Sequence, residues 1–437
     1  MHEWCRQKKQ DPLYPPLRVG IIGGAGTGKT KIINVIYELF ERQLHEPGET
    51  DEDPVCVKIS FTGMAACNID GITWHSFMGR GHGKIDSYKE LKEVSKAKAR
   101  DRWKNVKVII EDEISLETSK MDHEMDNFLN DVFQVPNSKK GEIHYNDISV
   151  IKVGDFMQLT MELWGKPLFQ NVGDTYGQFR PNHWKTNFRC FELTQSMRQK
   201  EEDFAKTVKT VRYMTIKNQD DLNNLTEEEK EALAFLRSRD IQQSHPDYPH
   251  TALHLFPTNE EVNKHNAAMI KTISNVNKIT ARESVMDETG SFKITSVKKA
   301  KDDQGLPAEL EVGIGAQVMV TRNQNVEDGI VNGMLGTVTG FTNSENQQVN
   351  IIWVKPDDKK AGMMKRRELK REFQSKFPGA IPIKRVEANI VVATNSTYKR
   401  CQFPLKLCFA ATIHKYQGRS MDVLVMGGFK GKGWKGN

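Results

Sequence analysis

Residues Gly23-Gly24-Ala25-Gly26-Thr27-Gly28-Lys29-Thr30 decide how this sequence of 437 residues is interpreted. The stretch satisfies the pattern G-x-x-x-x-G-K-[ST], and it lies between an apolar segment, residues 18–22, and a helical pattern, residues 29–43. In such a loop the glycines let successive backbone N–H groups turn inward around a phosphate, and the start of the helix adds partial positive charge. The stretch therefore predicts a nucleotide-phosphate site between a strand and a helix.

ATP and Mg²⁺ are the cofactors that this loop predicts. Lys29 should reach the β- and γ-phosphates, and the hydroxyl of Thr30 should bind Mg²⁺. The loop residues expected to surround the nucleotide are Gly23, Gly26, Thr27, Gly28, Lys29 and Thr30.

Two further apolar segments end in polar residues. Residues 106–110 lead to Asp112 and Glu113, and residues 148–153 lead to Gln158. Asp112 is expected to hold Mg²⁺ through water, and Glu113 to polarise the attacking water. Gln158 is expected to hydrogen-bond the γ-phosphate or that water; an ordinary turn residue is the alternative. Since acids at a strand end are common, this interpretation depends on the preceding phosphate loop.

Alternation of strands and helices predicts the fold class. Four β-branched segments, residues 18–22, 55–60, 106–110 and 148–153, are separated by helical patterns, which is typical of a doubly wound α/β domain with a parallel sheet. From about residue 311 to 394 the sequence becomes strand-rich, with turns of Gly, Asn and Pro, and this indicates a small β-barrel. A strand, helix and strand pattern then returns, so the barrel should split a second α/β domain.

Composition excludes some classes of protein. The net charge of +6 is compatible with a polyanionic partner but is also common without one, and the basic runs 84–104 and 365–376 are equally explained as solvated helix faces. The six cysteines show no paired CxxC spacing, so neither a zinc site nor a disulfide framework is indicated. No apolar run is long enough to span a membrane, and we expect an intracellular protein without membrane contact.

The order of the motifs resembles one family. Between residues 17 and 426 the motifs follow one another in this order: GGAGTGKT, SFTGMAACNIDGITWHSF, IIEDEIS, GDFMQL, ELTQSMRQ, LFPTNEEVNKHN, VGIGAQVMVTRNQ, IVNGMLGTVTGF and ATIHKYQG. This series resembles the PIF-type (petite integration frequency) 5′-to-3′ DNA helicases of superfamily one and is similar to the helicase portion of Helitron transposable elements. The resemblance implies two RecA-like P-loop domains, with a small SH3-like β-barrel inserted in the second.

The resemblance also implies domain bounds and a biological setting. The first RecA-like domain is expected over residues 1–190, with a small insertion at about 79–104. The second is expected over residues 191–310 and 405–437, and the barrel over 311–404. Single-stranded DNA and DNA junctions are the implied partners of a monomer that works in the nucleus or mitochondrion. The implied roles are genome maintenance, including repair, recombination and telomere maintenance, or Helitron transposition.

Several site residues are carried over from the family's motifs. Arg198 matches an arginine that reaches across the cleft to the γ-phosphate, although a surface arginine is the alternative; Gln417 and Gly418 match a segment near the nucleotide. For Phe77, as for Trp74, core packing is the alternative to stacking on a base. The residues matching DNA contacts are Thr62, Gly63, His75, Phe77, Asn332, Thr412, His414 and Lys415.

The sequence departs from the family in two places that bear on activity. Thr160 and Met161 stand where two prolines usually follow Gln158, and the family's last segment, which carries a second arginine for the γ-phosphate, does not follow Trp434. The leading hypothesis is an ATP-dependent helicase. A module that binds ATP and DNA with little hydrolysis or unwinding is the alternative, and stimulation of ATP hydrolysis by single-stranded DNA discriminates between them. A P-loop kinase or switch without DNA is disfavoured by TWHSF and TIHKYQG.

Overall fold

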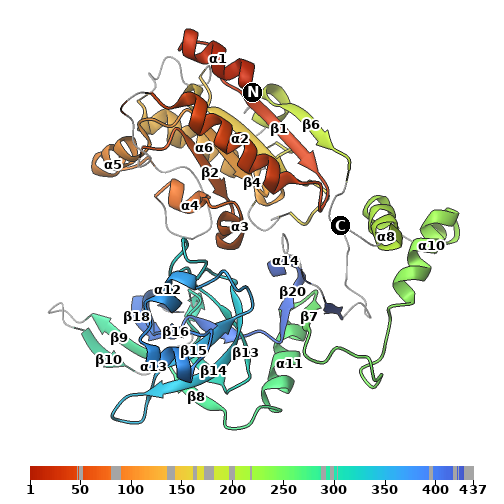
Figure 1. Cartoon of the computed structure of the whole chain (residues 1–437), viewed down its shortest axis with the longest axis vertical. Coiled ribbons are helices and arrows are strands. Elements are labelled where there is room, and N and C mark those ends of the chain that lie inside the picture. The colour runs from red at the N-terminus through yellow and green to blue at the C-terminus, as the bar shows by residue number, and fades with distance from the viewer. Residues whose placement is uncertain are drawn as a thin grey trace. The chain divides into compact units, whose positions relative to one another are not determined.

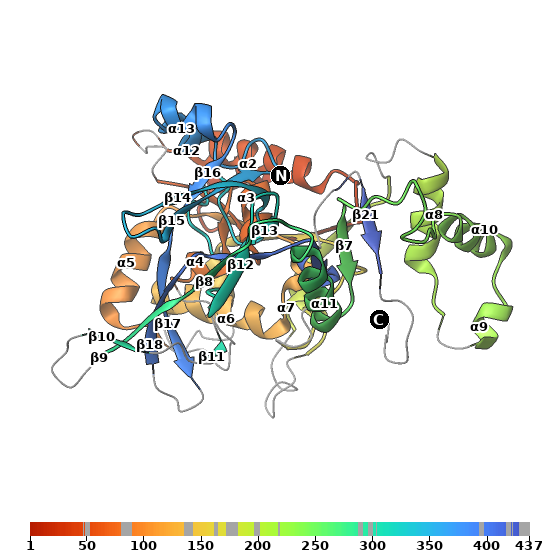
Figure 2. The same ribbon diagram turned by 90° about the horizontal axis from the view of Figure 1, so that it is seen from below.

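The computed structural model of the chain forms two compact units, Met1–Tyr248 and Pro249–Asn437. Each unit is described by itself (Figures 1 and 2). The structure describes residues 1–46, 48, 53–79, 90–134, 143–160, 165–171, 182–195, 202–216, 219–286, 292–295, 300–302, 304–392, 397–416, 421 and 423–427. Within these ranges, no helix combines the length and the apolar character that crossing a membrane requires.

The first unit is built on a parallel sheet with the strand order β3-β2-β4-β5-β1-β6. Strands β2, β4 and β5 are buried along their whole length, as expected for the centre of a parallel sheet covered on both faces. The four predicted strands are confirmed, and two further strands extend the sheet. The strands are β1 (Arg18–Gly23), β2 (Cys56–Ser60), β3 (Ile72–Thr73), β4 (Val108–Asp112), β5 (Ser149–Gly154) and β6 (Arg189–Leu193).

Alternate side chains of the strands enter two apolar clusters, one on each face of the sheet. On one face Val108 and Ile110 pack with Phe40 of α2, which lies in front of the sheet in Figure 1. On the other face Ile109 packs in the cluster that contains Phe128 of α6. The sheet is therefore doubly wound, as the sequence predicts. Its helices are α1 (His2–Gln10), α2 (Lys29–Leu44), α3 (Gly63–Asn68), α4 (Trp74–Phe77), α5 (Glu93–Trp103), α6 (Ser119–Val132) and α7 (His183–Asn187), with 3-10 turns η1 (Ile114–Leu116) and η3 (Tyr145–Asp147).

Three helices follow the sheet within the first unit: α8 (Glu202–Tyr213), α9 (Gln219–Asn223) and α10 (Glu227–Arg237). α8 and α10 lie side by side in both views (Figures 1 and 2), where the rings of Phe204 and Phe235 are 6.3 Å apart. α10 begins at a complete capping box, in which Thr226 and Glu229 each satisfy the other's backbone N–H.

The second unit contains a small parallel sheet with the order β20-β7-β21. Its strands are β7 (Leu253–Phe256), β20 (Ala410–Thr412) and β21 (Leu424–Met426), and its helices are α11 (Asn259–Ile270) and α14 (Ile413–Tyr416). The predicted strand at 253–256 and helix at 259–270 are confirmed. Asn266 of α11 bonds both backbone groups of Ala410, with its Oδ1 accepting from the N–H at 2.9 Å, and so fixes the helix against β20.

Antiparallel sheets occupy the middle of the second unit. One has the order β16-β15-β14-β13-β19 and another β10-β9-β18-β17-β11, beside the pair β12-β8. The strands are β8 (Asn277–Thr280), β9 (Arg282–Met286), β10 (Phe292–Thr295), β11 (Ala300–Asp302), β12 (Glu309–Val312), β13 (Gln317–Val320), β14 (Leu335–Asn343), β15 (Val349–Pro356), β16 (Ile381–Ile383), β17 (Val386–Val392), β18 (Thr397–Gln402) and β19 (Leu405–Leu407). Two short helices, α12 (Met363–Arg367) and α13 (Arg371–Lys376), connect β15 to β16.

Two pairings show how segments join the two units. The first unit continues to Tyr248, because β6 pairs with β1 and Arg212 of α8 bonds Asp155. Residues 405–407 form β19, which pairs with β13 of the antiparallel sheet, so the chain rejoins the parallel sheet only at Ala410. The division into three domains stays a prediction.

Candidate active site

The loop between β1 and α2 adopts a tight phosphate-binding conformation. Gly26 and Gly28 have φ values of 77° and 87°, in the left-handed region that favours glycine, and Gly28 caps the start of α2. The Thr27 hydroxyl donates to the carbonyl oxygen of Gly24 at 2.9 Å. A Cβ on Gly23 would lie 2.6 Å from that hydroxyl oxygen, so the loop has no room for a side chain there.

The Lys29 ammonium group lies across this loop. Its Nζ donates to the carbonyl oxygens of Gly23 at 3.0 Å and Gly24 at 2.9 Å. Burial lowers the pKa of Lys29, although the nearby carboxylates of Asp155 and Glu113 act in the opposite direction. A cation held by a glycine-rich loop at the start of a helix is suited to an anionic ligand such as a polyphosphate. Thr30, the next residue, is exposed at the start of α2.

Asp112 and Glu113 lie at the same edge of the sheet as the loop. Asp112 ends β4 and is in register with Val153 of β5, which in turn is in register with Ile21 of β1. Burial raises the pKa of Asp112 to about 6. Burial, together with the charge of Asp112, raises the pKa of Glu113 to about 7. Both carboxyls therefore lie beside Lys29 in a weakly solvated position.

Glu113 has the two features expected of a functional carboxylate. Its backbone is in the left-handed region, with φ 59° and ψ 45°, which is uncommon for a residue with a side chain. Its Oε2 is buried and accepts no hydrogen bond from the described residues. A strained residue whose carboxylate is buried, unsatisfied and high in pKa can accept a proton from water near neutral pH.

Gln158 follows β5 at this same edge. It is half-buried, and its backbone N–H donates to the carbonyl oxygen of Asp155 at 3.1 Å within a turn. The structure thus brings Lys29, Asp112, Glu113 and Gln158 to one sheet edge, as their positions after β1, β4 and β5 predict.

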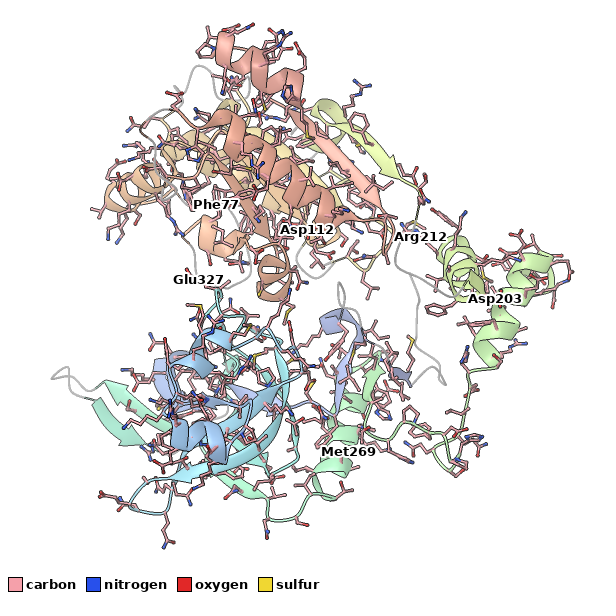
Figure 3. The ribbon with its side chains drawn as sticks, in the orientation of Figure 1. Phe77, Asp112, Asp203, Arg212, Met269 and Glu327 are labelled. Carbon is pink, nitrogen blue, oxygen red and sulfur yellow. The ribbon has the colours of Figure 1, made fainter. Side chains whose placement is uncertain are left out.

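Arg212 is a residue of this edge that the sequence did not reveal. Its guanidinium makes a bidentate ion pair with the wholly buried Asp155, at 2.6 Å and 2.5 Å. The guanidinium also lies close to the phosphate loop, since a Cβ on Gly24 would lie 3.6 Å from Cζ of Arg212. Figure 3 labels Arg212 on α8 and Asp112 at the end of β4. The pair joins the phosphate loop, the β5 turn and α8 across 57 residues of sequence. Because α8 has an ordinary amphipathic pattern, no sequence signal marks this arginine.

The DNA-contact residues predicted in the first unit have unequal exposure. Thr62 caps α3, with its hydroxyl oxygen accepting from the N–H of Ala65 at 3.2 Å, and Gly63 opens that short helix; both are half-buried. His75 is buried beside Trp74.

The prediction for Phe77 needs correction. Phe77 is 1% exposed and stacks on Trp103 at 4.8 Å, with the edge of Phe128 at 5.8 Å. This ring is core packing, the alternative stated above, because its faces are already in contact with apolar side chains. It offers no face for a base in this conformation.

The predicted residues of the second unit lie at strand ends and turns. Asn332 is exposed, and its backbone N–H donates to Asn323 at 2.7 Å. Thr412 ends β20, in register with Phe256, and Lys415 is exposed on α14. The side chain of His414 and the whole of Arg198, Gln417 and Gly418 lie outside the described residues.

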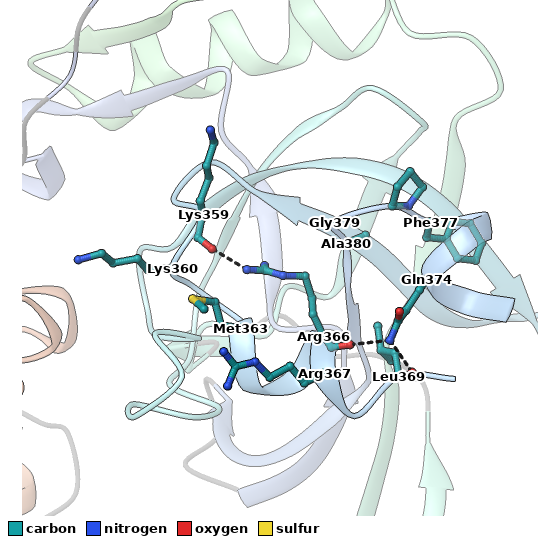
Figure 4. Close-up of a pocket in the computed structure, with 11 residues that line it drawn as sticks. Lys359, Lys360, Met363, Arg366, Arg367, Leu369, Gln374, Phe377, Gly379 and Ala380 are labelled. Carbon is teal, nitrogen blue, oxygen red and sulfur yellow. Dashed lines mark hydrogen bonds between the residues drawn. The ribbon is translucent and has the colours of Figure 1, made fainter. Parts of the chain in front are cut away.

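A basic hollow of about 670 Å³ lies under α12 and α13 in the second unit (Figure 4). Arg366 has a structural role, since its guanidinium donates to the carbonyl oxygens of Ala361 at 2.7 Å and Lys359 at 2.5 Å. Lys360 and Arg367 are exposed at its rim. This hollow contains no catalytic carboxylate among its described lining residues, so it is suited to contact with an anion rather than to chemistry.

Comparison with known proteins agrees with this geometry. A sequence profile described as PIF1-like helicase matches residues 18–222, and one described as the DNA helicase Pif1 2B domain matches residues 302–341; together they span more than half of the chain. The chain belongs to the PIF1-like helicase family. The resemblance seen in the sequence is therefore confirmed, and the 2B match falls on β11 to β14 of the antiparallel region.

Relatives support the family assignment at low identity. The chain is similar to the ATP-dependent DNA helicase PIF1 of Emericella nidulans, with 27% identity over 92% of this chain and 53% of that protein. It is also similar to PIF1 of Saccharomyces cerevisiae, with 27% identity over 78% of this chain and 36% of that protein. The chain thus spans about half or less of these curated relatives. It spans 82% of the Pif1 of Bdellovibrio bacteriovorus, at 27% identity over 97% of this chain.

Solved structures show the same fold. A Bacteroides Pif1 bound to single-stranded DNA superposes with a TM-score of 0.61 at 21% identity, covering 97% of this chain and 85% of that one. The Candida albicans Pif1 structure gives a TM-score of 0.61 at 21% identity, covering 97% and 87%. The predicted α/β fold class is confirmed by this likeness, and the antiparallel region contains the segment that matches the 2B domain.

Proposed function

We propose that the protein is an ATP-dependent DNA helicase that binds and moves along single-stranded DNA. One observation carries this proposal: the phosphate loop with Lys29 meets Asp112 and the strained Glu113, whose Oε2 is buried, at one edge of the parallel sheet. Family membership supplies the substrate class, because the relatives in PIF1-like helicases are named as ATP-dependent DNA helicases. ATP is the expected nucleotide.

The donor set fits Mg²⁺ bound with ATP. Asp112 offers a carboxylate and Thr30 a hydroxyl, and oxygen ligands of this kind are those that Mg²⁺ prefers. Bound there, Mg²⁺ would neutralise charge on the β- and γ-phosphates.

The chain's own residues then have separate tasks in hydrolysis. Lys29 exchanges its two carbonyl acceptors for phosphate oxygens. The Glu113 carboxylate accepts a proton from the attacking water. At the same time the water oxygen forms a bond to the γ-phosphorus, and the bond between the γ-phosphorus and the β-phosphate oxygen breaks. Gln158 orients that water. We also propose that Arg198 contacts the γ-phosphate, as its position in the family motif implies.

DNA contact is proposed for exposed and half-buried polar residues in both units. These residues can bind phosphates through hydroxyl, amide, backbone N–H and ammonium groups. They are Thr62 and Gly63 at the start of α3, Asn332, Thr412 and Lys415. Supporting this, a structurally similar Bacteroides Pif1 was solved with single-stranded DNA, and another structure has two Pif1 helicases on forked double-stranded DNA. We include DNA junctions as substrates on that basis. His75 and His414 stay in the proposed DNA set from their motif positions.

The finer functions are proposals from the motif resemblance. They are movement in the 5′-to-3′ direction, a role in repair, recombination and telomere maintenance or in Helitron transposition, action as a monomer, and work in the nucleus or mitochondrion. Strand displacement with 5′- and 3′-tailed duplexes tests the polarity directly. Faster unwinding of the 3′-tailed duplex would refute the proposed direction.

Steady-state ATP hydrolysis with and without a single-stranded oligonucleotide tests the main proposal. We expect stimulation by the oligonucleotide, and we expect Lys29→Ala and Glu113→Gln each to lower the stimulated rate at least about 100-fold. Lys31→Ala is the matched control, because Lys31 is exposed two residues further along α2. Binding of ATP and DNA without stimulated turnover would instead support the alternative of a binding module.

A further inference from the structure

Three side chains of the first unit converge at a place that the proposed helicase chemistry does not use. They are Asp126 on α6, His144 just before η3, and His183 at the start of α7. Each offers one possible ligand atom, and these atoms all lie within 4.8 Å of one another. The cluster lies before the first residues of β5 and β6, whereas the nucleotide edge lies at the other ends of the strands.

The spacing of these atoms fits a small divalent cation. Oδ2 of Asp126 lies 3.6 Å from Nδ1 of His144 and 3.5 Å from Nε2 of His183. Ligands of a tetrahedral Zn²⁺, with bonds of about 2.1 Å, lie about 3.4 Å from one another. The three atoms are therefore near the positions that a shared ion would require, while both distances are long for direct hydrogen bonds.

The other oxygen of Asp126 is held by its surroundings. Oδ1 accepts from the backbone N–H of Tyr145 at 2.6 Å and from Nδ2 of Asn130 at 3.2 Å. These bonds orient the carboxylate and leave Oδ2 facing the two imidazoles. Such support of a ligating carboxylate by neighbouring donors is usual at metal sites.

The histidine nitrogens that face Asp126 are unsatisfied. His183 is 2% exposed, and neither of its ring nitrogens has a hydrogen-bond partner in the described part of the chain. Nδ1 of His144 is also buried, and no described residue bonds it. Burying polar atoms without partners is costly, so this arrangement calls for a ligand.

We propose that Asp126, His144 and His183 bind one divalent transition-metal ion, with Zn²⁺ fitting best. Imidazole and carboxylate are ligands that Zn²⁺ accepts, and His₂-carboxylate sets occur in zinc proteins. The ring of His123 lies 4.6 Å from that of His183 and is the neighbouring candidate for a fourth ligand, with water as the other.

The position of the site indicates a structural role. His144 precedes β5 and His183 precedes β6, and these two strands flank β1 in the sheet. An ion bound by Asp126 together with the two histidines would link the starts of both strands to α6. It would thereby stabilise the strand that ends in the phosphate loop without taking part in hydrolysis.

Isothermal titration of the full chain with Zn²⁺, after removal of metals by a chelator, tests the site. We expect one Zn²⁺ per chain and a rise in the melting temperature on binding. His183→Gln and Asp126→Asn should each lower the affinity at least about 100-fold, since each removes a ligand. His245→Gln should leave it unchanged, because His245 is exposed and distant in sequence from the cluster.

Two further measurements separate loss of the site from loss of the fold. His144→Gln changes a half-buried side chain, so this variant should keep the wild-type circular dichroism and still lose Zn²⁺ affinity. Co²⁺ in place of Zn²⁺ should give the visible absorption of a four-coordinate site in the wild type and not in the variants. Failure of the metal-free wild type to take up one equivalent, or equal uptake by folded variants, would show that the cluster is only an ion pair between histidine and Asp126.

Discussion

Replacing Glu113 by glutamine should abolish activity and at the same time stabilise the ligand-free protein. Glu113 is half-buried, its Oε2 is buried and accepts no hydrogen bond from the described residues, and Asp112 lies beside it. Burial first, and the charge of Asp112 second, raise the pKa of Glu113 from 4.5 to about 7. At about 1.4 kcal/mol for each unit of pKa change, ionising this group in the folded state costs ~3–4 kcal/mol.

The sign of the pH dependence follows from the direction of this pKa change. An acid whose pKa is raised by folding binds its proton more tightly in the folded state, so the wild type gains stability as the pH falls from about 7 towards 4.5. The cost of the charged carboxylate is fully present above about pH 7 and absent below about pH 4.5. Glutamine has the same shape and never ionises. The stability difference between Glu113→Gln and wild type should therefore be ~3–4 kcal/mol at pH 8 and close to zero at pH 4.5.

Urea unfolding without Mg²⁺ or nucleotide measures this difference. The fluorescence of the buried Trp74 and Trp103 follows the first unit, and each variant is compared with wild type at both pH values. Glu345→Gln is the matched control, because Glu345 is exposed in the second unit and its substitution should change stability by less than about 0.5 kcal/mol at either pH. Equal or lower stability of Glu113→Gln at pH 8, or a gain that does not depend on pH, would show that the charged Glu113 carboxylate does not destabilise the folded state.

Three other predictions concern charged groups. Lys152→Met should destabilise the first unit by ~3–5 kcal/mol in urea unfolding, since it leaves the buried carboxylates of Glu117 and Asp122 without their cation. The control Lys104→Met changes a side chain that is 53% exposed and should cost less than about 1 kcal/mol. In a double-mutant cycle, Arg212→Ala and Asp155→Asn should show a coupling above about 1 kcal/mol; additive effects would mean that the pair does not act as a unit. The double substitution Lys360→Glu with Arg367→Glu should weaken single-stranded DNA binding in fluorescence anisotropy and make its salt dependence shallower by about 1–2, and an unchanged slope would exclude the basic hollow from DNA contact.

The nucleotide edge could be predicted from sequence because its signals are local. Glycine at 26 and 28, an apolar run before the loop and helical spacing after it together determine a strand, a turn with positive φ and a helix. Since parallel strands end at one edge of a sheet, the residues after β1, β4 and β5 had to meet. The positions of Lys29, Asp112 and Glu113 follow from this rule.

Other features depend on contacts between distant segments, which local patterns do not encode. Arg212 meets Asp155 across 57 residues, and His183 meets Asp126 through a helix packing that no spacing indicates. The burial of Phe77 could not be settled because an aromatic residue after a strand has the same pattern whether it packs in a core or stacks on a base. The place of β6 in the first sheet also depends on a distant contact, since β6 joins the sheet by pairing with β1.

Steady-state ATP hydrolysis by the wild type and by Glu113→Gln, with and without single-stranded DNA, decides whether the protein is a DNA-stimulated ATPase with Glu113 as its base. We expect DNA to stimulate the wild type, and we expect Glu113→Gln to bind ATP and DNA but to hydrolyse ATP at least about 100-fold more slowly. A wild-type rate that does not respond to DNA, or a Glu113→Gln variant that retains the stimulated rate, would contradict this expectation.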